Sequence, residues 1–132
     1  MKPVIPAPMK KFYDDFHFSP GVIEGNHLRL SGMIGFDLAT GGAPEDPEKQ
    51  FTLAFENVKL ILEEGGCSLA DIVEMTTYHV DFTKHIGTFV KVKNRFIVEP
   101  YPAWTGVGTT ALADPNGLVE IQVLARLPGI AG

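Results

Sequence analysis

The C-terminal part of the chain constrains the fold most, because two extended runs are separated there by residues that a strand does not tolerate. The runs cover residues 103–111 and 118–127. The residues between them include proline, asparagine and glycine, which favour a turn. This pattern predicts a β-hairpin near the end of the chain.

The second run alternates in a way that separates the two faces of a strand. One face is apolar and holds Val119, Ile121, Val123, Ala125 and Leu127. The other face holds Leu118, Glu120, Gln122, Leu124 and Arg126. A carboxylate on such a face costs free energy to bury unless it finds a donor, so Glu120 is a candidate for contact with water or a ligand. The alternatives are a solvated glutamate or one paired with Arg126.

Upstream, the pattern predicts a first hairpin and then a helix. Residues 16–23 and 28–34 flank a Glu-Gly-Asn-His turn. Asp46 is a candidate N-cap with Pro47 at the first helical position, and apolar residues follow at helical spacing. A Gly-Gly pair at 65–66 ends this helix, because glycine adopts the left-handed conformation readily.

A second strand and a second helix complete the predicted order. Residues 71–82 are rich in β-branched side chains, and we expect them to pair in parallel with the strand before the first helix. The second helix begins at Thr83 or Lys84, and Pro100 and Pro102 prevent it from continuing. The order β-β-α-β-α-β-β predicts one α+β domain over residues 1–132. Two helices cover only one sheet face, which favours an oligomer that covers the other.

Composition narrows the cellular setting and the partners. The chain is 45% hydrophobic and 20% charged, which is typical of a globular protein and not of a disordered or membrane protein. The N-terminal residues lack an apolar signal-like run, and their prolines favour an extended lead-in, so we expect a cytoplasmic protein. Cys67 is the only cysteine, which fits a reducing compartment, and we interpret it as a small buried residue.

Metals, cofactors and nucleic acids are not expected. The chain has 4 histidines, but none shows the spacing of a metal-binding motif. The glycine-rich stretch after residue 34 matches no phosphate-binding loop. A net charge of -5 counts against a surface that follows phosphates, because such binding depends on Lys and Arg.

Several segments carry a resemblance to a known family. They are PYPAWTGVG, LVEIQVLA, LRLSGMIGFD, QFTLAFEN and EGGCSLADIVEMTTYHVDF. In order and spacing they resemble the RidA/YjgF family, whose better-studied members hydrolyse reactive enamine and imine intermediates. The resemblance implies a chorismate-mutase-like fold with two helices packed on one sheet face. It also implies a homotrimer with small-molecule clefts between subunits.

The family pattern places an arginine after Pro-Ala, and this chain has Trp104 there. In this respect it is most similar to the YjgH-like members, which lack the arginine. A guanidinium binds a carboxylate through two parallel hydrogen bonds, whereas an indole offers one N–H and an apolar face. Trp104 would therefore favour a planar or uncharged ligand, with plain interface packing as the alternative. Nothing in the spacing places Arg29, Arg95 or Arg126 where they would replace the missing cation.

The resemblance also assigns roles to further residues. Glu120 would act as the general base that activates water for attack on a C=N carbon, and the backbone N–H of Gly106 would help hold that water. The expected ligand-binding residues are Trp104, Thr105, Phe18, Ser31 and Gly32. This site requires a strand register that brings Trp104, Gly106 and Glu120 onto one face, which we take from the family.

Three functions remain open from the sequence. The leading hypothesis is a small-metabolite-binding protein of this family, with enamine or imine deaminase activity of altered substrate range. The second is a non-catalytic ligand-binding or regulatory trimer. The third is an endoribonuclease or translation inhibitor, which the acidic charge disfavours.

Overall fold

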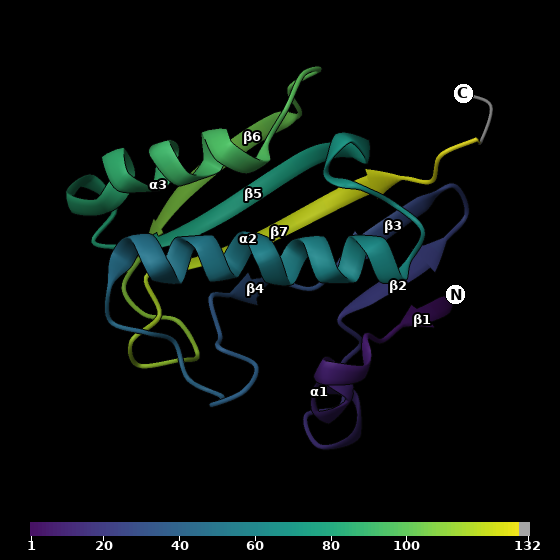
Figure 1. Ribbon diagram of the computed structural model, residues 1–132, viewed down its shortest axis with the longest axis horizontal. Helices are drawn as coiled ribbons and strands as arrows, with labels where there is room; N and C mark the ends of the chain where they lie inside the picture. Colours follow the sequence, from purple (N-terminus) through teal and green to yellow (C-terminus); the bar gives the residue numbers. More distant parts are fainter. Residues whose placement is uncertain (130–132) are drawn as a thin grey trace.

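The structure, a computed structural model, describes residues 1–129. Its strands are β1 (Lys2–Val4), β2 (Gly21–Glu24), β3 (His27–Leu30), β4 (Met33–Ile34), β5 (Ile72–Val80), β6 (Ala103–Thr109) and β7 (Val119–Arg126). They form one 7-stranded sheet in the order β1-β2-β3-β7-β5-β6, and β4 also pairs with β7 (Figure 1). The last three residues of the predicted domain lie outside the described residues.

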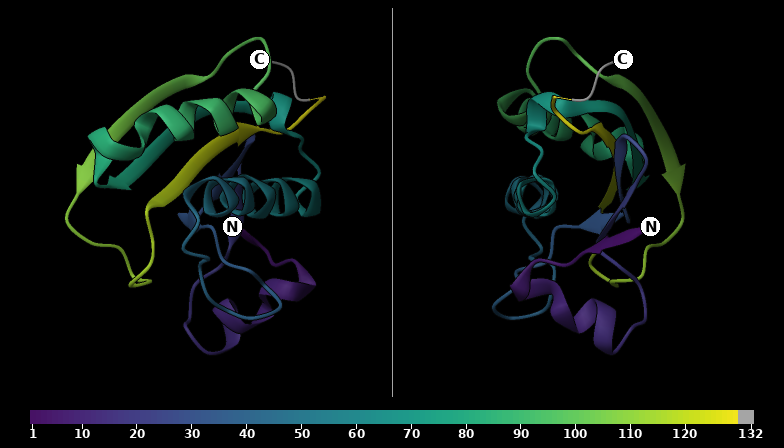
Figure 2. Two further views of the ribbon diagram at one scale, coloured as in Figure 1. Left: turned by 60° about the vertical axis from the view of Figure 1, so that its left-hand side comes forward. Right: turned by 90° about the vertical axis from the view of Figure 1, so that its right-hand side faces the viewer.

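Two long helices lie on one face of this sheet (Figure 2). They are α2 (Pro47–Glu64) and α3 (Phe82–Phe96). The Asp46 carboxylate caps α2 by accepting a hydrogen bond from the backbone N–H of Lys49 at 2.9 Å. After α2, Gly66 adopts the left-handed conformation with φ +85°, while Gly65 keeps φ -86°. The α+β class, the first helix and its cap are therefore as predicted.

The predicted C-terminal hairpin is wrong. β6 and β7 are not neighbours, because β5 lies between them and pairs in parallel with β6 and antiparallel with β7. The reason is burial: β5 carries buried Met75, Thr77 and His79, whereas all of β6 except its last residue is exposed. Gly106 and Gly108 give β6 little side chain to bury, so it fits the edge of the sheet better than its centre.

The predicted pairing of residues 71–82 is wrong in the same way. The strands before α2 are β3 and β4, and both pair with β7 in antiparallel fashion. β5 instead runs parallel to β6, so α3 is the helix that connects two parallel strands. The sequence thus predicts a parallel crossover but assigns it to the wrong pair of strands.

The N-terminal segment is more ordered than the predicted lead-in. Strand β1 pairs with β2 from Lys2↔Ile23 to Val4↔Gly21. A 3-10 turn (Ala7–Met9) follows and leads into α1 (Lys10–Asp14), and Met9 is fully buried. The first predicted hairpin is confirmed by β2 and β3, but its strands are shorter than predicted.

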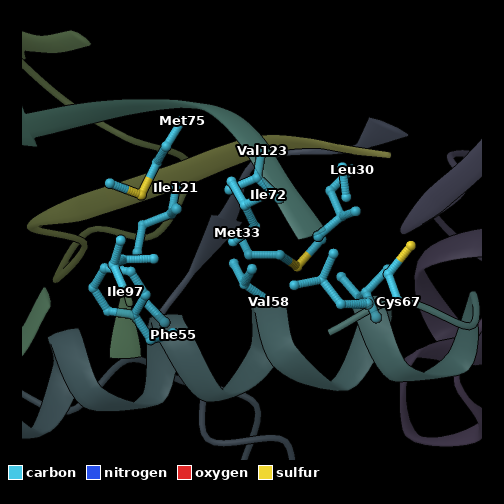
Figure 3. Close-up of a cluster of buried hydrophobic side chains, with 14 of the residues drawn as sticks. Leu30, Met33, Phe55, Val58, Cys67, Ile72, Met75, Ile97, Ile121 and Val123 are labelled. Carbon is cyan, nitrogen blue, oxygen red and sulfur yellow. The ribbon is translucent and has the colours of Figure 1, made fainter. Parts of the chain in front are cut away.

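The core lies between the sheet and the two long helices (Figure 3). Met75, Ile121 and Val123 point from the sheet toward Phe55 and Val58 of α2. Phe51, Phe55 and Phe89 are completely buried, and truncating such a side chain to Ala costs about 3–5 kcal/mol. In the part of the chain that the structure describes, no helix is both long and apolar enough to cross a membrane.

Candidate functional site

Glu120 lies in β7 on the sheet face away from α2 and α3, which we call the open face. Its neighbours Val119 and Ile121 are fully buried in the core, so the alternation that the sequence predicts in this strand is confirmed. Glu120 itself is half-buried. Burial raises the pKa of its carboxyl above the ordinary value, because a partly desolvated site disfavours the charged form.

The Glu120 carboxylate lies against the backbone of Gly32. A methyl group added to Gly32 would stand 2.5 Å from Oε2 of Glu120 and 2.6 Å from its carboxyl carbon. Any side chain at residue 32 would therefore displace the carboxylate. The space that the missing side chain leaves is filled by Glu120, so Gly32 positions this acid directly.

A hollow of about 550 Å³ includes Ser31, the residue before Gly32, in its lining. It is lined by Met1, Tyr13, His17, Phe18, Ser19, Val22 and Ser31. Phe18 forms an aromatic wall, because its ring stacks on Phe12 at 5.3 Å. The Ser31 hydroxyl donates to the carbonyl of Ser19 at 2.7 Å, which fixes the hydroxyl oxygen at the wall. Phe18 and Ser31 line this hollow, and Gly32, the residue after Ser31, lies against the Glu120 carboxylate. We call Phe18, Ser31, Gly32 and Glu120 the β7 half-site.

Trp104 lies on the opposite face of the sheet, which corrects the expected register. Parallel pairing places Trp104 beside Met75 and Gly106 beside Thr77, and both partners point into the core. Glu120 pairs instead with Tyr78, one residue out of phase with Thr77. Because side chains alternate along a strand, a single chain cannot bring Trp104, Gly106 and Glu120 onto one face.

The residues of β6 form a second group, which we call the β6 half-site: Trp104, Thr105 and Gly106. Trp104 leans toward α3, with its ring centroid 6.0 Å from that of Phe89. A methyl group at Gly106 would stand 2.9 Å from the ring of Phe82, so this glycine lets the edge strand lie close to α3. Thr105 pairs with Thr76 and faces the open side.

A buried hydrogen-bond chain holds the Trp104 indole. Its Nε1–H donates to Oγ1 of Thr77 at 2.9 Å, and Thr77 in turn lies 2.7 Å from Nε2 of His79. The His79 ring stacks on Phe82 at 4.4 Å and is almost completely buried. Burial lowers the pKa of His79 to about 4, so the imidazole is neutral at pH 7. The sequence analysis did not single out Thr77 or His79 for this role. Their position at every second residue after Met75 is the pattern that could have placed them on the buried face.

Residues that the sequence raised for other chemistry lie outside the two half-sites. Among residues 1–129 no group of three His, Cys, Asp or Glu side chains could hold a metal ion. Burial, with a smaller effect of Asp71, raises the pKa of the Cys67 thiol to about 11, so this thiol stays protonated. Two of the arginines considered as replacements for the missing cation can also be located. Arg95 contacts Glu48 at 3.6 Å on the helix surface, and Arg29 lies in β3 on the open face.

Most of the chain is similar to proteins of one known family. The family model described as Endoribonuclease L-PSP matches residues 10–127. The chain is 37% identical over 127 residues to the RutC family protein YjgH of Escherichia coli, covering 95% of this chain and 94% of that protein. This chain belongs to the RidA/YjgF family.

Solved RidA/YjgF structures share the fold. The structure of protein YjgH superposes with a TM-score of 0.88 at 35% identity, covering 98% of both chains. RidA from the Antarctic bacterium Psychrobacter sp. gives a TM-score of 0.78 at 34% identity, covering 83% of this chain and 88% of that one. Relatives in the family carry different functional names. One relative, from Dermatophagoides farinae, is called 2-iminobutanoate/2-iminopropanoate deaminase. It is 30% identical to this chain over 106 residues, and the match covers 80% of this chain and 81% of the relative.

Proposed function

We propose that this protein binds a small metabolite between copies of the chain and hydrolyses an imine or enamine there. The observation that carries the proposal is the half-buried Glu120 carboxylate, which lies against Gly32, the residue that follows Ser31 in the wall of an open hollow. The deaminase name of one relative supports the reaction class. Such a protein would act on metabolites in the cytoplasm, where we expect it to reside.

Glu120 has the properties that a general base for water requires. Burial raises the pKa of Glu120, which brings this pKa closer to the pH at which the protein works. In the proposed reaction Glu120 removes a proton from water as the oxygen attacks the C=N carbon. That proton passes to the nitrogen and gives a carbinolamine. Glu120 then transfers the hydroxyl proton to the same nitrogen, the C–N bond breaks as the C=O bond forms, and ammonia and a carbonyl compound leave.

The arrangement of the two half-sites supports assembly between subunits. Glu120 lies on the open face and Trp104 on the helix face, so a cleft that uses both needs a second copy of the chain. The edge strand β6 is exposed and includes Val107, which is 39% exposed. Within residues 1–129 its outer backbone groups have no strand partner, and a neighbouring subunit would cover them. We propose a homotrimer in which the β6 half-site of one copy meets the β7 half-site of the next.

The direct test is hydrolysis of freshly generated imines with and without the protein. Wild-type protein should accelerate release of the carbonyl product, and Glu120→Gln should lower the rate by at least about 100-fold. Glu74→Gln is the matched control, because Glu74 is an exposed carboxylate on the adjacent strand β5. No acceleration by the wild type would leave a non-catalytic binding protein. RNA cleavage that disappears with Glu120→Gln would instead support a ribonuclease.

Subunit mixing tests where the two halves lie. Glu120→Gln and Trp104→Ala proteins should each be impaired as pure oligomers. After joint unfolding and refolding, mixed oligomers should regain part of the wild-type rate, because some clefts then receive an intact half from each copy. If both halves belonged to one chain, the mixture would show no gain over the average of the two variants.

A further inference from the structure

Lys93 lies over the indole of Trp104. Its Nζ is 5.0 Å from the centre of the ring, and it also donates to Oδ1 of Asn94 at 3.0 Å. An ammonium above an indole is attracted by the negative face of the ring. This contact holds a positive charge at the sheet edge, beside the β6 half-site.

The basic residues of α3 differ in their ion pairs. Lys91 contacts Glu48 at 3.1 Å and Arg95 contacts the same carboxylate at 3.6 Å. Lys93, between them in sequence, forms no ion pair with any carboxylate in residues 1–129. It is also half-buried, whereas Lys91 and Arg95 are exposed. Lys93 is therefore a cation whose charge is held by an aromatic ring and is still available to an anion.

The indole beneath Lys93 is fixed in place. Its N–H donates a hydrogen bond to the buried hydroxyl of Thr77. Its ring lies near Phe89, which is one helical turn before Lys93. A rigid ring with an ammonium above it presents an apolar surface and a single positive charge side by side. That combination fits a small molecule with an apolar part and one carboxylate.

We propose that Lys93 determines specificity by binding the carboxylate of the ligand, with Trp104 as its support. This inference rests on the proposed function and deepens it, because it names the residue that would take the place of the arginine that the family pattern has at position 104. It replaces the expectation of an uncharged ligand that Trp104 alone suggests. An ammonium forms a point-charge contact and not a two-bond fork, so we expect moderate affinity.

The fluorescence of Trp104 provides the test, because it is the only tryptophan in the chain. Wild-type protein is titrated with 2-oxobutanoate and, separately, with its uncharged methyl ester. We expect saturable quenching by 2-oxobutanoate and much weaker binding of the ester. Lys93→Met should weaken 2-oxobutanoate binding by about tenfold or more and leave ester binding almost unchanged. Lys93→Arg should keep most of the affinity.

Lys91→Met is the matched control, since it removes a lysine from the same helix that is paired with Glu48, and it should bind both ligands as the wild type does. Equal affinity of wild type and Lys93→Met for 2-oxobutanoate would overturn the inference. It would also be overturned if Lys93→Met lost affinity equally for 2-oxobutanoate and the ester, or if the wild type showed no saturable binding. Hydrolysis is measured separately. Lys93-dependent binding without hydrolysis would overturn the proposed reaction and support the anchor.

Discussion

The carboxylate of Glu120 and the α-carbon of Gly32 occupy adjoining space, so that a methyl group at residue 32 would stand 2.5 Å from Oε2. The group it would meet is the end of a flexible side chain, which rotates away at low cost. We therefore expect Gly32→Ala to change stability by less than about 1 kcal/mol and to lower imine hydrolysis by about 100-fold, because Glu120 loses its position. Thermal unfolding and steady-state rates measure the two effects.

Gly87→Ala is the control for that substitution. Gly87 lies inside α3, and apart from its chain neighbours and the backbone of its own helix an added methyl group there would have no atom within 4 Å. Replacing a helical glycine by alanine should stabilise the protein by about 0.5–1 kcal/mol and leave the rate unchanged. A Gly32→Ala protein as active as Gly87→Ala would show that the placement of Glu120 by Gly32 does not matter for the reaction.

Glu120→Gln should stabilise the protein at neutral pH. Burial raises the folded-state pKa of Glu120, so the folded state holds this proton more tightly than the unfolded state. Stability from this group is present at low pH and is lost as pH rises through the unfolded and then the folded pKa. The melting temperature of Glu120→Gln should exceed that of wild type at pH 7, and the difference should shrink toward pH 4. A constant difference at all pH values would contradict this explanation.

His79 should make the protein sensitive to acid. Its pKa is about 4 in the folded protein and about 6.5 in the unfolded chain, so below pH 6.5 the unfolded state binds a proton that the folded state does not. The free energy of unfolding should therefore fall between pH 6.5 and 4, by up to about 1.4 kcal/mol per pH unit from this group. Urea titrations at several pH values should show a smaller slope for His79→Phe. An unchanged slope would mean that His79 titrates normally.

Gln50 should be important for stability because it joins two loops to α2. Its side-chain amide donates to the carbonyls of Pro44 and Asn116, and its oxygen accepts from the backbone N–H of Leu118 at 2.6 Å. The side chain is completely buried. Gln50→Ala should cost about 2–4 kcal/mol in urea unfolding, whereas the exposed neighbour variant Lys49→Ala should stay within about 0.5 kcal/mol. Similar values for both would show that the loops hold without this amide.

The sequence predicted local structure better than strand order, for a physical reason. The cap at Asp46, the helix end near Gly66 and the alternation around Glu120 depend on neighbours a few residues apart, and each is confirmed. Which strand lies beside which depends on burial across the whole sheet. A turn-like stretch at residues 112–117 suggested that β6 and β7 are adjacent, but the connection passes the end of β5.

The candidate site shows the same division. The resemblance groups Phe18, Ser31, Gly32 and Glu120. In the structure Phe18 and Ser31 line one hollow, and Gly32, the residue after Ser31, lies against the Glu120 carboxylate. Trp104 and Gly106 lie on the other face. Which face each residue of β6 occupies depends on the pairing of β6 with β5, and no local sequence pattern reveals that pairing. Lys93 was missed for a similar reason: a lysine on a helix contacts an indole on a strand only after α3 packs against the sheet.

The exposed edge of β6 has a consequence for how the protein behaves in dilute solution. An uncovered edge strand can template pairing with any other chain. If copies of the protein cover that edge in the working assembly, dilution would remove catalysis and expose an aggregation-prone strand in the same event. Loss of activity and the onset of turbidity would then share one threshold concentration.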